Sequence, residues 1–153
     1  MFRVLIFTVL FTATVVNAFW TACGGSATTH EVTSNVCSGD RCNVVRGQTM
    51  IANTTISFAE PHHQLTVRVR TVLLGITITL PLTPEAEDAC RGIFIQGSVF
   101  HGCPVTVGTR FNWVMETQIP QNIPAFQNNI VYTELLDHND EIVSCSRLLA
   151  TVV

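Results

Sequence analysis

Six cysteines are the residues with the clearest chemistry in this sequence. An even number of cysteines in an exported chain predicts three disulfides, and six cysteines allow fifteen pairings that spacing alone does not resolve. Metal binding is the alternative, but no Cys-x-x-Cys pair or His-x-x-x-His spacing accompanies them. The cysteines are Cys23, Cys37, Cys42, Cys90, Cys103 and Cys145.

The histidines and carboxylates form no recognisable catalytic or metal site. His62 and His63 are adjacent, and neighbouring residues of a strand point to opposite faces, so they are poorly placed to share an ion. Glu85, Glu87 and Asp88 cluster in a proline-bounded stretch, where we expect them to be solvated. No Gly-x-Ser-x-Gly nucleophile elbow is present. We therefore expect no metal, no cofactor and no enzymatic activity.

The N-terminus predicts a secretory signal peptide over residues 1–18. Arg3 precedes an apolar run from Val4 to Val16, and Ala18 is a small residue suited to the cleavage point. Removal of this segment leaves residues 19–153, enough for one domain with a sizeable core. We expect a secreted, single-domain, monomeric protein.

Composition limits the classes of partner. The chain is 47% hydrophobic and only 12% charged, and its eight basic residues are all arginine. Outside the predicted signal peptide, seven arginines stand against eleven carboxylates. Nucleic-acid binding requires a basic stripe, which this sequence does not have.

Apolar residues alternate with polar ones along most of the chain. In residues 50–58 and 65–73, hydrophobic side chains occupy most of the alternate positions, and residues 76–80 and 111–116 repeat the pattern. This period of two predicts half-buried antiparallel strands. No segment predicts a helix of ten or more residues. The fold class is therefore all-β, with a β-sandwich favoured over a small up-and-down barrel.

Asn53-Thr54-Thr55 is an N-glycosylation sequon. Asn53 falls on the polar face of its predicted strand, so a glycan attached there would point into water. In an exported protein, this residue is the candidate glycosylation site. A glycan can also act as a sorting signal, so a protein with a secretory signal peptide can still be delivered to endosomes or lysosomes.

The cysteines and their neighbours resemble the ML domain, a lipid-recognition family that includes Niemann–Pick type C protein two, group-two mite allergens and secreted co-receptors of toll-like receptors. The similarity extends over nearly the whole predicted mature chain. It is carried by Cys23-Gly24, Val36-Cys37, Arg41-Cys42, Asn53-Thr54-Thr55, Leu74-Gly75-Ile76, Leu80-Pro81-Leu82, Cys90, Cys103-Pro104-Val105, Ile119-Pro120, Ile123-Pro124 and Cys145.

The resemblance implies an immunoglobulin-like sandwich of two antiparallel sheets with an apolar lipid cavity between them. It also implies that Cys23 pairs with Cys145, Cys37 with Cys42, and Cys90 with Cys103. By position, the family's sterol-pocket residues fall on Leu80, Ile119 and Ile123. The sterol carriers have aromatic residues at the first and third of these places, so a flexible acyl chain is as plausible a ligand here as a sterol. The further wall candidates are Phe58, Val69, Phe111, Trp113 and Tyr132.

The twelve residues between Cys90 and Cys103 are apolar and rich in glycine, and the sterol carriers have a shorter connection there. One interpretation is a tethered flap in which Phe94 and Phe100 cover the cavity mouth. The other is that the stretch completes an ordinary strand and the core.

Three functions use such a cavity. We expect a secreted carrier of a sterol, a fatty acid or a similar apolar ligand, delivering it to a membrane or a receptor partner. An innate-immune adaptor that presents a microbial glycolipid to a receptor is the alternative, and it would need basic residues at the mouth, for which Arg68, Arg70, Arg91 and Arg110 are the candidates. A semiochemical carrier would use the same pocket physics.

Overall fold

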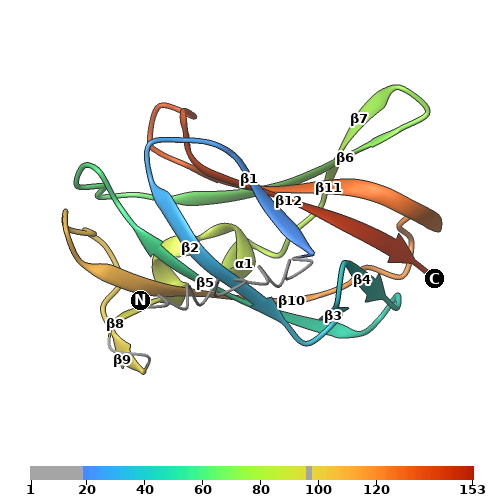
Figure 1. The fold of residues 1–153 in the computed structure, drawn as a ribbon, viewed down its shortest axis with the longest axis horizontal. Coiled ribbons are helices and arrows are strands. Elements are labelled where there is room, and N and C mark those ends of the chain that lie inside the picture. Colours follow the sequence, from blue (N-terminus) through green and yellow to red (C-terminus); the bar gives the residue numbers. More distant parts are fainter. Residues whose placement is uncertain (1–18, 96–97) are drawn as a thin grey trace, which may run out of the picture.

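The computed structural model describes residues 19–95 and 98–153, and they form two facing β-sheets (Figure 1). The predicted signal peptide lies outside the described residues and stays a prediction. The first sheet has the strand order β3-β4-β12-β11-β6-β7, with β1 also paired to β12. Its strands are β1 (Trp20–Gly24), β3 (Cys37–Ser38), β4 (Arg41–Val44), β6 (Thr66–Leu73), β7 (Ile76–Leu80), β11 (Phe126–Leu136) and β12 (Ile142–Val152).

The second sheet has the order β2-β5-β10-β8-β9 and faces the first across the core. Its strands are β2 (Thr28–Ser34), β5 (Thr49–Ser57), β8 (Ile93–Ile95), β9 (Val99–Phe100) and β10 (Arg110–Gln118). The all-β sandwich predicted from the sequence is confirmed. Strand pairing is antiparallel except between β4 and β12, which run parallel.

The predicted alternation decides which side chains enter the space between the sheets. In β6, Val67, Val69 and Thr71 are buried while the intervening residues are partly exposed. In β10, Phe111 is fully buried, and every second residue after it is also buried. These two strands therefore each have one face toward the core and one face toward water.

Helical structure is limited, among the described residues, to two single turns between β7 and β8. These are α1 (Pro84–Glu87) and the 3₁₀ turn η1 (Ala89–Gly92). The hydroxyl of Thr83 caps α1 by accepting a hydrogen bond from the N–H of Ala86, and Asp88 caps η1 through the N–H of Cys90. The acidic cluster noted in the sequence thus occupies solvated turns. No described helix has the length and apolarity needed to cross a bilayer.

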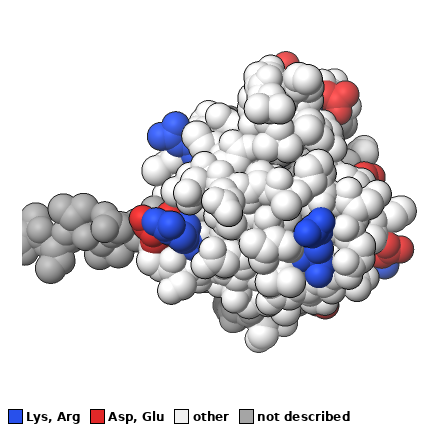
Figure 2. All heavy atoms as spheres, turned by 90° about the vertical axis from the view of Figure 1, so that its right-hand side faces the viewer, with Lys and Arg blue, Asp and Glu red and all other residues white. Residues whose placement is uncertain are grey.

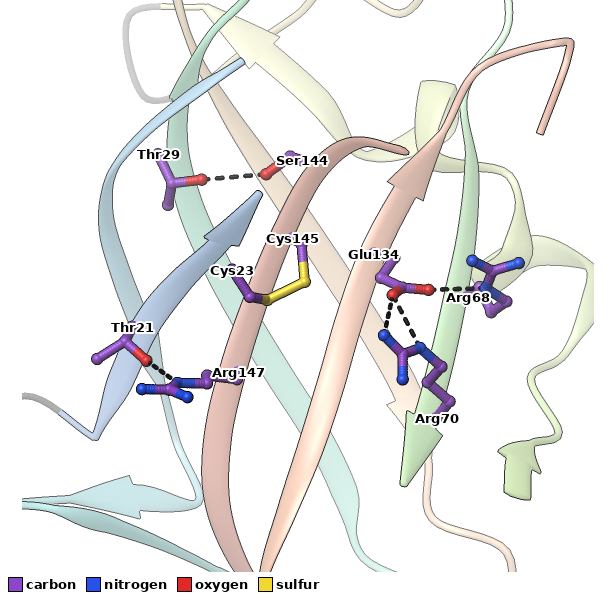
Figure 3. Close-up of a disulfide and its surroundings, with 9 residues drawn as sticks. All are labelled: Thr21, Cys23, Thr29, Arg68, Arg70, Glu134, Ser144, Cys145 and Arg147. Atoms are coloured by element: carbon purple, nitrogen blue, oxygen red, sulfur yellow. Dashed lines mark hydrogen bonds and ion pairs between the residues drawn. A yellow bond between two sulfur atoms is a disulfide. The ribbon is translucent and has the colours of Figure 1, made fainter. Parts of the chain in front are cut away.

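Three disulfides connect the cysteines in the arrangement that the resemblance implied. Cys23 of β1 is joined to Cys145 of β12, so the bond links the two ends of the domain (Figure 3). Cys37 and Cys42 close the β3–β4 turn. Cys90 and Cys103 bridge the segment that holds β8 and β9. No cysteine of the described residues is free.

Candidate functional site

One end of the sandwich is filled by large side chains. Phe58 and Phe111 pack with their ring centroids 5.8 Å apart. Leu65, Ile93 and Val105 are fully buried around them. Aromatic rings and branched chains of this size leave little space between two sheets. These side chains belong to one hydrophobic core cluster, which also includes residues at the other end of the sandwich such as Trp113 and Ile119.

A cavity occupies the other end, between the same two sheets. The atom-free volume here is about 1000 Å³ when the open solvent at its mouth is included, and about 90 Å³ of it can hold the centre of a water-sized sphere. The first sheet contributes alternate residues of β12, including Leu148, Ala150 and Val152. The second contributes alternate residues of β5 and β10, including Ala52 and Met115. The period of two in these strands therefore builds both walls.

The cavity lining is apolar apart from a few uncharged groups. Hydroxyl and amide side chains come from Ser34, Thr54, Thr117, Gln118, Thr133 and Ser146, and no described residue of the lining is charged. Figure 2 views the molecule from the end that carries the tip of β7, β4 and the C-terminus, where charged side chains are scattered over a mainly uncharged surface. A charged group moved into this cavity would lose its hydration and would find no oppositely charged side chain to compensate for the loss. The arrangement is suited to an apolar ligand.

The sequence profile of the ML domain family matches residues 17–152. The chain belongs to the ML domain family. Mite group 2 allergen Lep d 2 of Lepidoglyphus destructor is 26% identical over 124 residues, which are 80% of this chain and 78% of the allergen. NPC intracellular cholesterol transporter 2 of Canis lupus familiaris is 22% identical over 112 residues, or 73% of this chain and 69% of that protein.

Solved structures share the fold of this ML domain. A Niemann-Pick type C2 protein from Japanese carpenter ant superposes with a TM-score of 0.72 at 16% identity, covering 88% of this chain and 98% of the ant protein. Chicken MD-1, crystallised with lipid IVa, superposes with a TM-score of 0.54 at 15% identity over 85% of both chains. At these identities the comparison establishes the fold.

Five residues predicted for the cavity wall do line the cavity of this ML domain: Val69, Leu80, Trp113, Ile119 and Ile123. The backbone after β10 is held by two hydrogen bonds, from Gly47 N–H to the carbonyl of Ile119 (2.8 Å) and from Ile119 N–H to the carbonyl of Gln48 (2.9 Å). These bonds tie the segment that carries Ile119 to the loop before β5. Ile119 and Ile123 are both buried.

Three other wall candidates, Phe58, Phe111 and Tyr132, are not among the residues that line the cavity. Phe58 and Phe111 point between the sheets but fill the closed end. Tyr132 is on the outer face of β11, where the Arg70 guanidinium lies 4.2 Å from its ring centroid. The pleat explains this placement, because Val131 and Thr133 on either side of Tyr132 are the cavity-facing residues of that strand.

The segment between Cys90 and Cys103 is not placed as the flap interpretation expected. The described part of the segment forms β8 and β9 at one edge of the second sheet, and none of its described residues lines the cavity (Figure 1). Ile93 is fully buried and completes the core. Phe94 and Phe100 contact each other edge to face at 5.8 Å, and Phe100 is 62% exposed. The alternative interpretation, an ordinary strand, describes this segment.

Several lining residues were not among the sequence candidates. Met50, Ala52 and Met115 belong to the apolar faces that the period of two identified, so the signal for them was present. Phe19 and Phe126 carried no comparable signal. Phe19 directly follows the predicted signal peptide, and Phe126 stands at the start of a strand whose next residues are polar.

A buried ion cluster lies outside the cavity, on the outer face of the first sheet (Figure 3). Glu134 is fully buried, and its carboxylate accepts hydrogen bonds from Arg68 Nε at 2.7 Å and Arg70 Nε at 2.8 Å. Burial alone would raise the pKa of Glu134, but the bonds from Arg70 and Arg68 outweigh it and hold the pKa below the ordinary value. Two of the four arginines suggested as headgroup ligands, Arg68 and Arg70, are therefore engaged within the protein.

Proposed function

We propose that this ML domain is a secreted carrier that holds a lipid or similar apolar small molecule between its two sheets. The observation that supports the proposal is the cavity whose lining contains no charged residue. Burial of each methylene contributes roughly 0.8 kcal/mol, so a long acyl chain offers on the order of 10 kcal/mol before the costs of binding. Such a slot needs few polar groups to bind its ligand.

Fatty acids and sterols are the ligand classes that this proposal favours. Leu80, Ile119 and Ile123 line the wall with aliphatic side chains, so no flat aromatic ring stands at these three positions. A flexible chain adapts to such a wall at least as well as a rigid ring system does. The adaptor hypothesis has less support, because Arg68 and Arg70 are paired with Glu134.

The test begins with protein secreted from eukaryotic cells. Native mass spectrometry would show whether a small molecule is retained, and solvent extraction would identify it. A stoichiometric fatty acid or sterol supports the proposal. A protein that is empty and takes up neither lipid contradicts it, whereas retention of a phosphorylated glycolipid or of a volatile semiochemical would favour the corresponding alternative.

A matched pair of variants locates the binding site. Ala52→Phe projects a ring into the cavity from β5, while Ile51→Phe changes the neighbouring residue, which is 42% exposed on the other face of the same strand. Displacing two or three ligand methylenes would weaken acyl-chain binding by roughly tenfold to a hundredfold. We expect that loss for A52F and no change for I51F. Equal affinities in two folded variants would place the ligand elsewhere.

A further inference from the structure

The outer strand of the first sheet, β7, has a free hydrogen-bonding edge. A two-residue turn, Leu74-Gly75, joins β6 to β7, so the flanking pair Leu73–Ile76 exchanges hydrogen bonds and the following pairs alternate. Thr77 and Thr79 therefore direct their N–H and carbonyl groups away from β6. Among the described residues, no group on the open side of β7 hydrogen-bonds to either threonine.

This edge also lacks the features that normally prevent strand pairing. Proteins protect free edges with charges, prolines, bulges or very short strands. In the described residues, β3 and β9 have two residues each, and β2 carries Glu31 and a bulge. In contrast, β7 is five residues long, reads Ile-Thr-Ile-Thr-Leu and pairs with β6 without a register shift.

Apolar side chains accompany the open edge. Ile76 is 67% exposed, and Leu74 at the tip of the hairpin is completely exposed. Ile76, Ile78 and Leu80 share one face of β7 because alternate residues of a strand point the same way. Leu80 lines the cavity, so this face continues from the cavity mouth out to the hairpin tip.

We propose that β7 pairs antiparallel with β7 of a second copy of this chain, joining two first sheets into one. A two-fold axis at Ile78 sets Thr77 opposite Thr79 of the other copy and forms four backbone hydrogen bonds. The neighbouring registers would set one threonine opposite Gly75 of the turn or Pro81, which has no N–H. Only the symmetric register therefore gives a hydrogen-bond partner to every outward N–H and carbonyl group of Thr77 and Thr79.

The same register brings the second copy to the ligand site. Ile76 of one chain comes opposite Leu80 of the other, next to the mouth that Leu80 helps to form. Pairing therefore covers exposed apolar surface and places the two mouths near the shared strand edge. This inference about assembly stands independently of which ligand the cavity binds, and it differs from the monomer expected from the sequence.

The first experiment measures the oligomeric state of the full secreted protein by sedimentation velocity over a dilution series. We expect a dimer that dissociates on dilution. Thr77→Lys adds a protecting charge to the open edge, and its matched control is Thr33→Lys on edge strand β2, where Thr33 is also exposed. T77K should weaken dimerisation by at least about tenfold, because pairing would bring the lysine charge into the interface, while T33K should not. A wild-type protein that stays monomeric, or a T77K dimer as tight as wild type, would overturn the proposal.

A second measurement tests the register. Ile78 is opposite its own copy as a non-hydrogen-bonded pair, in which the Cα atoms of facing residues are about 4.5 Å apart. Ile78→Cys should therefore form a covalent dimer under mild oxidation, mapped by mass spectrometry with the three native disulfides intact. Thr33→Cys is the control and should remain uncrosslinked. Equal crosslinking of both variants would contradict the β7 interface.

Discussion

Arg70 holds the buried carboxylate of Glu134 through two nitrogen atoms, with Nε 2.8 Å and Nη2 2.7 Å from Oε1. The two residues lie on neighbouring strands of the first sheet, and Glu134 is paired in register with Cys145 of the terminal disulfide. The cluster therefore stabilises the outer face of this sheet, opposite the face that lines the cavity (Figure 3).

This cluster predicts a loss of stability in acid. The pKa of Glu134 is lower in the folded protein than in the unfolded chain, so its stabilising contribution is complete above the ordinary pKa of about 4.3 and is lost as the pH falls through the folded value. Glu134→Gln should cost on the order of 2 kcal/mol at neutral pH. Urea unfolding from pH 7 to pH 3 should show a smaller acid loss in E134Q than in wild type. Parallel curves would mean that Glu134 does not titrate with folding.

The terminal disulfide should contribute more stability than the short one. Cys23 and Cys145 are 122 residues apart, whereas Cys37 and Cys42 are separated by five. In the chain-entropy model, these loops correspond to roughly 5 and 2 kcal/mol. Urea unfolding of C23A/C145A and C37A/C42A would measure the two losses. A larger loss for the short loop would show that local packing outweighs the unfolded-chain entropy.

Charges placed in the cavity wall should abolish lipid binding. Ile119→Asp with Ile123→Asp introduces two carboxylates into a lining that has no charge to pair with them. We expect retention of an acyl ligand to fall below detection in the folded double variant, with near-UV circular dichroism reporting the fold. The control is Ile142→Asp, a partly exposed residue outside the cavity. Unchanged binding in the folded double variant would move the ligand to another site.

Truncation of the β8–β9 aromatic pair should leave ligand binding unaltered. Phe94 and Phe100 lie outside the cavity lining and contact each other at the far edge of the second sheet. Phe94→Ala with Phe100→Ala is therefore expected to keep the acyl-chain affinity of wild type in a fluorescence titration. A marked loss of affinity, with the fold intact, would restore the flap interpretation.

Asn53 should carry a glycan when the protein is secreted from eukaryotic cells. Asn53 is exposed on the outer face of β5, while Thr54 of the same sequon points inward to the cavity. Enzymatic removal of N-glycans should lower the apparent mass of wild type, and Asn53→Gln should abolish that shift. A wild-type mass that does not change would show that the sequon is unused.

The sequence alone determined which face of most strands enters the core. Alternation in β5, β6 and β10 assigned buried and exposed residues correctly, because the pleat has a period of two whatever the strand pairs with. The cysteine count predicted three disulfides, and the resemblance to the ML domain supplied their pairing. The resemblance also located Leu80, Ile119 and Ile123 on the cavity wall.

Tertiary structure decided where the interior is filled and where it is hollow. Phe111 and Trp113 lie on the same inward face of β10. Phe111 nevertheless packs against Phe58 in the closed end, while Trp113 lines the cavity. Periodicity predicts which way a side chain points. Whether it then meets packed atoms or a cavity depends on the distance between the sheets and on the size of the side chains from strands far away in the sequence.

Long-range pairing also decided the roles of Tyr132 and of the segment after Cys90. Tyr132 and Glu134 belong to the outer face of β11 because Arg68 and Arg70 of β6 lie beside them there. The β8 strand lies near the edge of the second sheet because it pairs with the β10 residues 111–113 on one side and with the short strand β9 on the other. Neither contact is local in sequence, and a buried glutamate or an apolar loop has no periodicity that would reveal its partner.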